Sequence, residues 1–98
     1  MEEPTTLAEQ FDSEMGKLTQ DRGRSYGHPL DGFNIAGRIA DAVASCPDAE
    51  VRHALRMIGV KMARLCTTPS HFDSALDIAG YARTILMIAD ERKRREKT

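Results

Sequence analysis

The chain has 98 residues, a formal net charge of −1 and an apolar set dominated by Ala, Leu, Ile and Met, with few aromatic residues. This composition favours helices over strands, and a chain this short forms one domain with a small core. The nearly balanced charge argues against a domain held on nucleic acid by its overall charge, so nucleic acid is not expected as a partner. No apolar run approaches the roughly 18 residues of a membrane span, and no membrane role is predicted.

The two cysteines indicate the cellular compartment. Cys46 and Cys66 lack the C-x-x-C spacing of zinc and redox sites, and no secretory signal precedes them. We therefore expect reduced, buried thiols in a soluble cytoplasmic protein.

Hydrophobic periodicity predicts four helices. The first opens at Thr6, where Glu9 completes a capping box, and its apolar stripe is Leu7, Phe11, Met15 and Leu18. Residues 1–5 are expected to fray, and Gly23 ends this helix or the turn after it. The second helix begins near Asp31, stops before Pro47 and places inward Phe33, Ala36, Ile39, Ala40 and Val43.

The third and fourth helices are expected to form an antiparallel hairpin, because only a few residues join them. Asp48 caps the third helix, whose packing seam is Val51, Leu55, Ile58, Met62 and Leu65. After a break at residues 67–70, Ser70 and Asp73 open the fourth helix with a pattern like a capping box. This helix is expected to bury Phe72, Leu76, Ala79 and Leu86, on a face broad enough for another subunit as well.

The chain ends in a basic run, Arg92–Lys97. Such a run is typical of a solvated helix end whose cations suit the helix dipole, and contact with nucleic acid or an acidic partner is the alternative. We predict a single all-α domain over residues 1–98, with a basic tail at 92–98.

Opposite charges face each other across the predicted hairpin. In an antiparallel pair, residues whose numbers add to nearly the same value lie level, which pairs Lys61 with Asp77 and Arg64 with Asp73. We call these two predicted pairs the rungs of a charge ladder. Tyr81 continues the row of Asp73 and Asp77 on the fourth helix. One interpretation is a salt-bridge network that fixes helix register. The other is a binding site, in which the cations hold phosphate or carboxylate oxygens and the aspartates orient them.

The segment at residues 22–29 is a loop by its glycines and proline, and it concentrates Arg24, Tyr26 and His28. These side chains either shape a turn or close over a ligand at the ladder. Gly80 is unfavourable inside a helix, which indicates close approach of a backbone, through helix packing, or of a ligand.

A divalent metal is a further alternative. Asp73 and Asp77, joined by His71, are oxygen and nitrogen donors that would suit Mg²⁺ or Mn²⁺, although a histidine in the first turn of a helix is commonly a surface residue. The sequence requires no cofactor.

Three strings resemble the motifs of a family of small phage-encoded domains of unknown function. They read R-G-x-x-Y-G-x-P, K-x-x-R-L and H-x-D-x-x-x-D-I-A-G-Y at residues 22–29, 61–65 and 71–81, and the resemblance covers roughly residues 17–90. More distantly, the chain is similar to nucleotide-modification-associated domains of phages and to MazG-like nucleotide pyrophosphohydrolases. This resemblance implies a helical protein, MazG-like in broad outline and usually homo-oligomeric, that acts on nucleotides. If a phage encodes it, the protein would lie in the host cytoplasm.

The chain departs from the MazG-like pattern at its metal ligands. Those enzymes bind magnesium through E-E-x-x-E on one helix and E-x-x-D on the next, because several carboxylates must hold the cation. Here the third helix offers only Glu50, and it is basic where it faces Asp73 and Asp77. Nucleotide association is therefore the expectation, and pyrophosphohydrolase activity is not.

Three functions follow from these observations. The first is binding of a nucleotide or nucleotide-derived anion by Lys61, Arg64, Asp73, Asp77 and Tyr81, lined by Arg24, Tyr26 and His28. The second is a MazG-like enzyme with one metal on Asp73 and Asp77. The third is a non-catalytic module that binds a host or phage protein through the fourth helix.

Overall fold

The computed structural model describes residues 6–15 and 27–97, and these residues contain helices and no strand. The helices are α1 (Leu7–Met15), α3 (Pro29–Val43), α4 (Ala49–Thr67) and α5 (Phe72–Glu96). The predicted all-α, four-helix class is confirmed. None of the described helices is both long enough and apolar enough to cross a bilayer.

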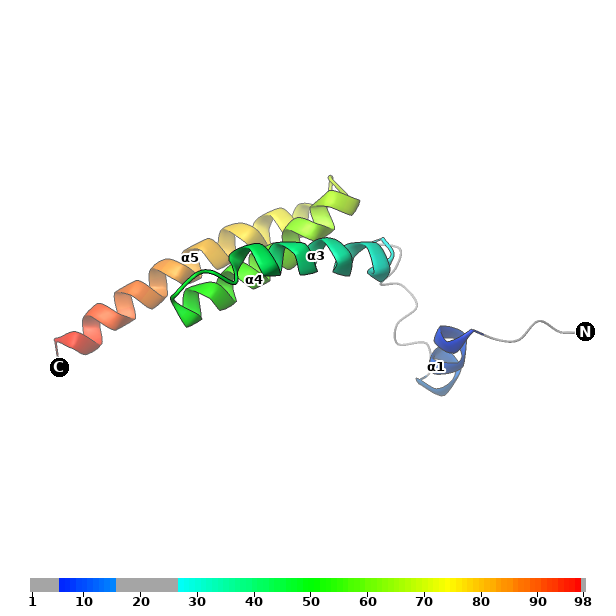
Figure 1. Ribbon diagram of the computed structural model, residues 1–98, viewed down its shortest axis with the longest axis horizontal. Helices are drawn as coiled ribbons and strands as arrows, with labels where there is room; N and C mark the ends of the chain where they lie inside the picture. The colour runs from blue at the N-terminus through cyan, green and yellow to red at the C-terminus, as the bar shows by residue number, and fades with distance from the viewer. Residues whose placement is uncertain (1–5, 16–26, 98) are drawn as a thin grey trace, which may run out of the picture.

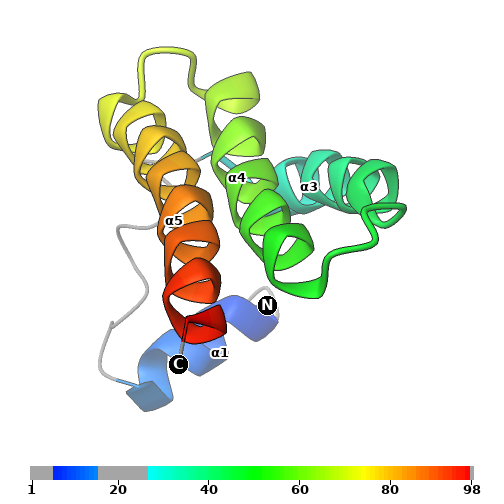
Figure 2. The ribbon, with the colours of Figure 1, turned by 90° about the vertical axis from the view of Figure 1, so that its left-hand side faces the viewer.

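Helices α3, α4 and α5 form one layer with α4 in the middle. Figure 2 shows α5 and α3 on opposite sides of α4, and α4 contacts both neighbours. Helix α5 runs antiparallel to α4 after the short connection at residues 68–71, as predicted for the hairpin. Helix α1 lies apart from this layer (Figure 1).

Helices α4 and α3 come close together at Gly59. A Cβ atom added to Gly59 would lie 2.7 Å from Cγ2 of Ile39, which is shorter than real Cβ contacts. The absent side chain therefore allows the two helices to approach. Gly59 is buried, as are Ala54 and Ala63 on the same helix and Ser74 on α5.

The buried residues of the described chain are all small, and several large apolar side chains are exposed. Phe33, expected to point inward from α3, is 75% exposed, while on α5 Phe72 is 71%, Leu76 54% and Leu86 66% exposed. The inward placement of these four was wrong for the single chain. Ala79 of α5, Met62 of the predicted α4 seam and the α1 stripe are also exposed, and Leu18 lies outside the described residues.

Two of the predicted helix starts are confirmed. At α1, the backbone N–H of Glu9 donates to Thr6 Oγ1 and that of Thr6 donates to Glu9 Oε2, which is the reciprocal capping box. At α4, the N–H of Val51 donates to Oδ1 of the N-cap Asp48 at 3.1 Å. Each side chain satisfies a donor that has no partner within the helix.

The other two predicted helix starts differ in detail from the structure, in which both helices are capped by histidine. Helix α3 begins at Pro29 rather than near Asp31, because proline suits the first helical position and His28 Nδ1 accepts from the N–H of Leu30. Helix α5 is capped by His71 rather than Ser70, with the N–H of Ser74 donating to His71 Nδ1 at 3.2 Å.

The predictions for the cysteines and the basic run are confirmed only in part. Both cysteines are free thiols, as expected, but Cys46 is only half-buried and Cys66 is exposed. The basic run continues α5 as helix through Glu96. Residues 1–5 and Gly23 lie outside the described residues.

Candidate functional site

One predicted rung of the charge ladder is present between α4 and α5. Lys61 Nζ lies 3.1 Å from Asp77 Oδ2, with 14% of the lysine side chain and 46% of the aspartate side chain exposed. The lysine stem is packed between the helices while its ammonium group is held by a carboxylate that solvent reaches. This pairing confirms both the antiparallel register and the sequence rule that predicted it.

The second rung, Arg64 with Asp73, stays a prediction. Arg64 is half-buried in the last turn of α4, where its carbonyl oxygen accepts from the Thr68 N–H and from Thr67 Oγ1. Asp73 is exposed in the first turn of α5. Both residues therefore lie on the side of the Lys61–Asp77 pair that is nearer to the hairpin turn.

His71 and Ser74 form a small polar cluster at the start of α5. His71 Nδ1 lies 2.7 Å from Oγ of Ser74, which is fully buried. Because the same ring nitrogen accepts the Ser74 N–H, this histidine acts as a helix cap. Among the described residues, no group of three or more His, Cys, Asp or Glu side chains is arranged to hold a metal ion.

The loop motif ends beside the hairpin turn. Gly27 has a φ of 75°, in the left-handed region that glycine adopts readily, and an added Cβ would lie 3.4 Å from Cβ of Thr67. His28 follows as the exposed cap of α3. Arg24 and Tyr26, the other predicted loop residues, lie outside the described residues.

These contacts bring three segments to one end of the helical layer. The start of α3 meets the end of α4 through Gly27 and Thr67, and the short hairpin connection places the start of α5 there as well (Figure 1). Two helix N-termini, which favour negative charge, thus lie beside the turn with Lys61 and Arg64 close behind it on α4. We call this end of the layer the hairpin end; it comprises the start of α3, the start of α5 and the last turns of α4 from Lys61 onward.

Tyr81 lies further along α5, one turn beyond Asp77. It is half-buried and lines an open groove between α4 and α5 together with Ala49, Glu50, His53, Ala54, Met57, Thr84 and Ile88. Neither Lys61 nor Asp77 lines this groove, which runs from Tyr81 towards the start of α4.

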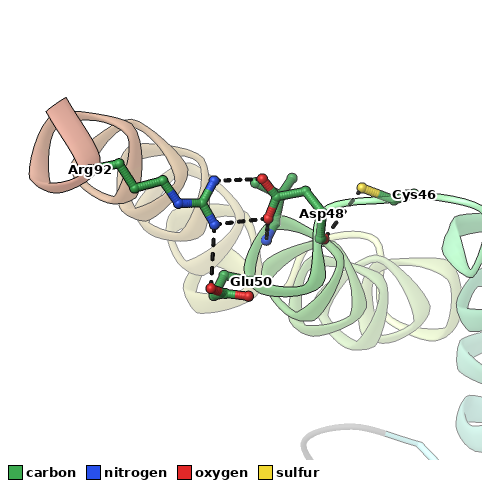
Figure 3. A network of polar contacts seen from close by, with 5 residues as sticks. Cys46, Asp48, Glu50 and Arg92 are labelled. Atoms are coloured by element: carbon green, nitrogen blue, oxygen red, sulfur yellow. Dashed lines mark hydrogen bonds and ion pairs between the residues drawn. The ribbon is translucent and has the colours of Figure 1, made fainter. Parts of the chain in front are cut away.

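A second polar network, which sequence reasoning missed, holds the opposite end of the hairpin. Arg92 donates through Nη2 to Asp48 Oδ1 at 3.0 Å and through Nη1 to Oδ2, and its Nη2 lies 3.4 Å from Glu50 Oε1 (Figure 3). Cys46 Sγ contacts the Asp48 carbonyl oxygen at 3.7 Å. The rule that pairs Lys61 with Asp77 also pairs Asp48 with Arg92, so the signal was in the sequence.

This network and its neighbours shift several pKa values. The hydrogen bonds from Arg92, and then the Val51 N–H, hold the pKa of Asp48 well below its ordinary value, and the Asp48 carboxylate in turn raises the pKa of Arg92. On the last turns of α5, hydrogen bonds from Arg94 and Arg95 lower the pKa of Glu91 to about 2. All of these groups stay charged near neutral pH, so the Arg92–Asp48 ion pair that joins α5 to the start of α4 persists there.

The fold and its polar groups define a small all-α domain built on an antiparallel helical hairpin. The chain belongs to the family described as a domain of unknown function, DUF6378, whose profile matches residues 13–89. It is also 32% identical over 71 residues to the Gene 55 protein of Mycobacterium phage D29, an alignment that covers 72% of this chain and 47% of the phage protein. The chain therefore spans about half the length of that relative.

No solved structure matches the chain. The family and the phage relative together make this a small phage-type domain of unknown function.

Proposed function

We propose that the protein is a phage-type accessory protein that binds a nucleotide or nucleotide-derived anion at the hairpin end. The observation that carries this proposal is the Lys61–Asp77 pair, in which a largely buried lysine is oriented by a half-exposed carboxylate. A cation held in this way loses little further freedom when an anion arrives, and its ammonium group has three donors, so a ligand oxygen can accept from it beside Asp77. Asp77 orients Lys61 and Arg64 is the second anion contact.

The surroundings of the pair support an anionic ligand. The N-termini of α3 and α5 lie at the same end, and their dipoles favour negative charge there. Tyr81, one helical turn beyond Asp77 in the groove between α4 and α5, is proposed to offer an aromatic face on which a base stacks. Arg24, Tyr26 and His28 are proposed to line the ligand from the loop, and Asp73 to orient the cations or hold a ribose hydroxyl.

Thermal unfolding with a panel of nucleotides, cyclic dinucleotides and nucleotide sugars, with and without Mg²⁺ or Mn²⁺, tests the proposal. A ligand at about a thousand times its dissociation constant adds roughly 4 kcal/mol, which moves the midpoint of a domain this size by well over 10 °C. Lys61→Met should remove the shift, because the apolar stem is kept and the charge is lost. Arg56→Met is the matched control, since Arg56 is an exposed cation elsewhere on α4, and it should leave the shift intact.

The possible outcomes distinguish ligand binding by Lys61 from a purely structural role of this residue. A shift retained in Lys61→Met would place the ligand elsewhere, and no shift across the panel would contradict the proposal for those ligands. A MazG-like enzyme stays a prediction, and it requires metal-dependent turnover of a nucleoside triphosphate that Asp77→Asn abolishes.

A second candidate function is a module that binds a host or phage protein. The exposed aromatic and aliphatic side chains of α3 and α5 favour it, because monomeric proteins rarely leave large apolar patches in water. Such a module predicts no effect of any nucleotide on unfolding.

A further inference from the structure

The groove that Tyr81 borders continues along α5 towards its basic end. Two adjoining hollows between α4 and α5 share Glu50, Thr84 and Ile88, and the second reaches Arg95. The apolar residues that line this continuous groove are Ala49, Ala54, Met57, Met87 and Ile88. Met87 is 52% exposed, so the groove presents apolar surface to water.

Helix α1 carries an apolar stripe and packs little against the other described helices. Leu7, Phe11 and Met15 recur every fourth residue and are 83%, 47% and 45% exposed. Among the described helices, the extensive contacts are those of α3 with α4 and of α4 with α5, and α1 lies apart from them (Figure 1). A helix of nine residues is only marginally stable in water by itself. A surface that covers the α1 stripe would therefore stabilise this helix.

The charges of the two elements are complementary. Residues 1–15 contain five acidic and no basic residues. The walls of the groove, residues 48–57 and 81–97, contain eight basic and five acidic residues. The rest of the layer, residues 27–47 and 58–80, contains three basic and four acidic residues. The groove therefore lies in the part of the layer that attracts an acidic helix.

We propose that α1 docks in this groove of its own chain, with its apolar stripe against the apolar lining and its acidic side chains among the cations of the walls. The α1 stripe is about 12 Å long, and the groove between Thr84 and Arg95 extends over about 16 Å, at 1.5 Å per residue. Helix α1 thus fits beyond Tyr81 without covering it. This is a second position of α1, in which its stripe leaves water.

The chain between α1 and α3 is long enough for this position. Gly27 lies beside Thr67 at the hairpin end, and Ala49 is about 27 Å from Thr67 along α4. The twelve chain links from Met15 to Gly27 reach up to about 40 Å when extended. Helix α1 can therefore reach the groove of its own chain.

Nuclear Overhauser contacts between the Phe11 ring and labelled methionine methyl groups, recorded on the full chain without nucleotide, test the proposal. Phe11 should contact Met87, which lines the groove. Met62 is the control within the same chain, because it is an exposed methionine of α4 that does not line the groove, and it should show no contact. A mixture of labelled and unlabelled chains shows whether the contact forms within one chain.

A pair of α1 variants tests whether the stripe drives docking. Phe11→Glu should remove the shift that docking causes in the Met87 methyl resonance and lower the midpoint of thermal unfolding by at least about 4 °C. Ser13→Glu is the matched control, because it adds the same charge to α1 on the side opposite Phe11. This control should retain both the Met87 contact and the midpoint.

Two results would overturn the proposal. A wild-type chain in which Phe11 contacts neither Met87 nor Ile88 would leave the groove to a different occupant. A contact that appears only between different chains would make α1 of a second copy the occupant. Neither result bears on anion binding by Lys61 at the hairpin end, because these measurements contain no nucleotide.

Discussion

At the scale of single residues, Gly59 controls how closely α3 approaches α4. A Cβ at this position would meet Cγ2 of Ile39 at 2.7 Å and its Cβ at 3.4 Å. Isoleucine is branched next to the backbone, so it has little freedom to move aside. Gly59→Ala should therefore destabilise the protein, because overpacking costs about 1–3 kcal/mol and outweighs the gain of roughly 1 kcal/mol in helix propensity. Urea unfolding measures the change.

Gly37 on α3 provides the control, since nothing lies within 4 Å of its missing Cβ. Gly37→Ala should raise stability by about 0.5–1 kcal/mol. The double variant Gly59→Ala/Ile39→Ala should be less destabilised than the sum of its parts, because Ile39→Ala removes the clashing atom. Equal stabilisation by both glycine substitutions would mean that the α3–α4 contact is loose.

Two carboxylates make stability sensitive to acid. Asp48 and Glu91 have folded-state pKa values below their ordinary values of 3.8 and 4.5, with that of Glu91 at about 2. The stability they contribute is complete above the ordinary values and is lost as pH falls through the folded values, because protons then bind the unfolded chain first. The midpoint of thermal unfolding should therefore fall as pH is lowered from about 4.5 towards 2.

The share due to Asp48 can be isolated. Arg92→Gln removes the main cause of its lowered pKa, so the midpoint should fall less steeply over the same pH range. Arg83→Gln is the control, because Arg83 donates to the sulfur of Met87 and to no carboxylate in the described hydrogen bonds, and its acid profile should match the wild type. Identical profiles in all three proteins would contradict the role given to the Arg92–Asp48 pair.

At the scale of helices, His71 stabilises the start of α5 by two contacts. It accepts the Ser74 N–H and lies 2.7 Å from the buried Ser74 Oγ. His71→Ala should cost about 1–2 kcal/mol, because the helix loses its cap and a buried hydroxyl loses a partner. His71→Asn should retain most of the stability, since asparagine is a good N-cap. His53→Ala, at an exposed position inside α4, should change stability by less than about 0.5 kcal/mol.

The helix starts show how far sequence reasoning reaches. Thr6 and Asp48 were predicted as caps because a short polar side chain stood three residues before a donor it could satisfy. His28 and His71 were missed because imidazole is not among the side chains that usually cap helices, although its unprotonated nitrogen accepts in the same way. Pattern alone does not show which ring nitrogen will face a backbone N–H.

The ion pairs between the helices were likewise predicted in one case and missed in another. Antiparallel level pairing predicted Lys61 with Asp77, because a short connection fixes the register of two helices. The Arg92–Asp48 pair obeys the same geometry but was missed, since Arg92 was interpreted as part of a solvated basic run. Periodicity predicted that Phe33 lies on the apolar face of one helix, and Phe72 and Leu86 on the apolar face of another. It does not show whether the rest of the same chain covers these faces, and the structure leaves all three residues exposed.

At the scale of the whole molecule, the described helices other than α1 form a single layer of three. Helix α4 occupies the middle and contributes most of the buried residues, while α3 and α5 form the two edges. Both edges expose large apolar side chains, with Leu30 and Phe33 on α3 and, on α5, an apolar stripe of Phe72, Leu76 and Leu86. A layer one helix thick covers only the inner sides of its outer helices, which explains why the core is small.

The homo-oligomer that the family resemblance implies stays a prediction, and if its subunits meet through the α5 stripe, folding and association are one process. The stability of a dimer that unfolds to two chains then depends on protein concentration, with each tenfold change contributing about 1.4 kcal/mol. For roughly 200 residues in the dimer, the midpoint of thermal unfolding should rise by about 3–5 °C for each tenfold increase in concentration. Leu76→Glu should unfold at a lower temperature that no longer depends on concentration. A wild-type midpoint that is constant over a hundredfold range would show that each chain folds alone, and the exposed stripe would then need a partner of a different kind.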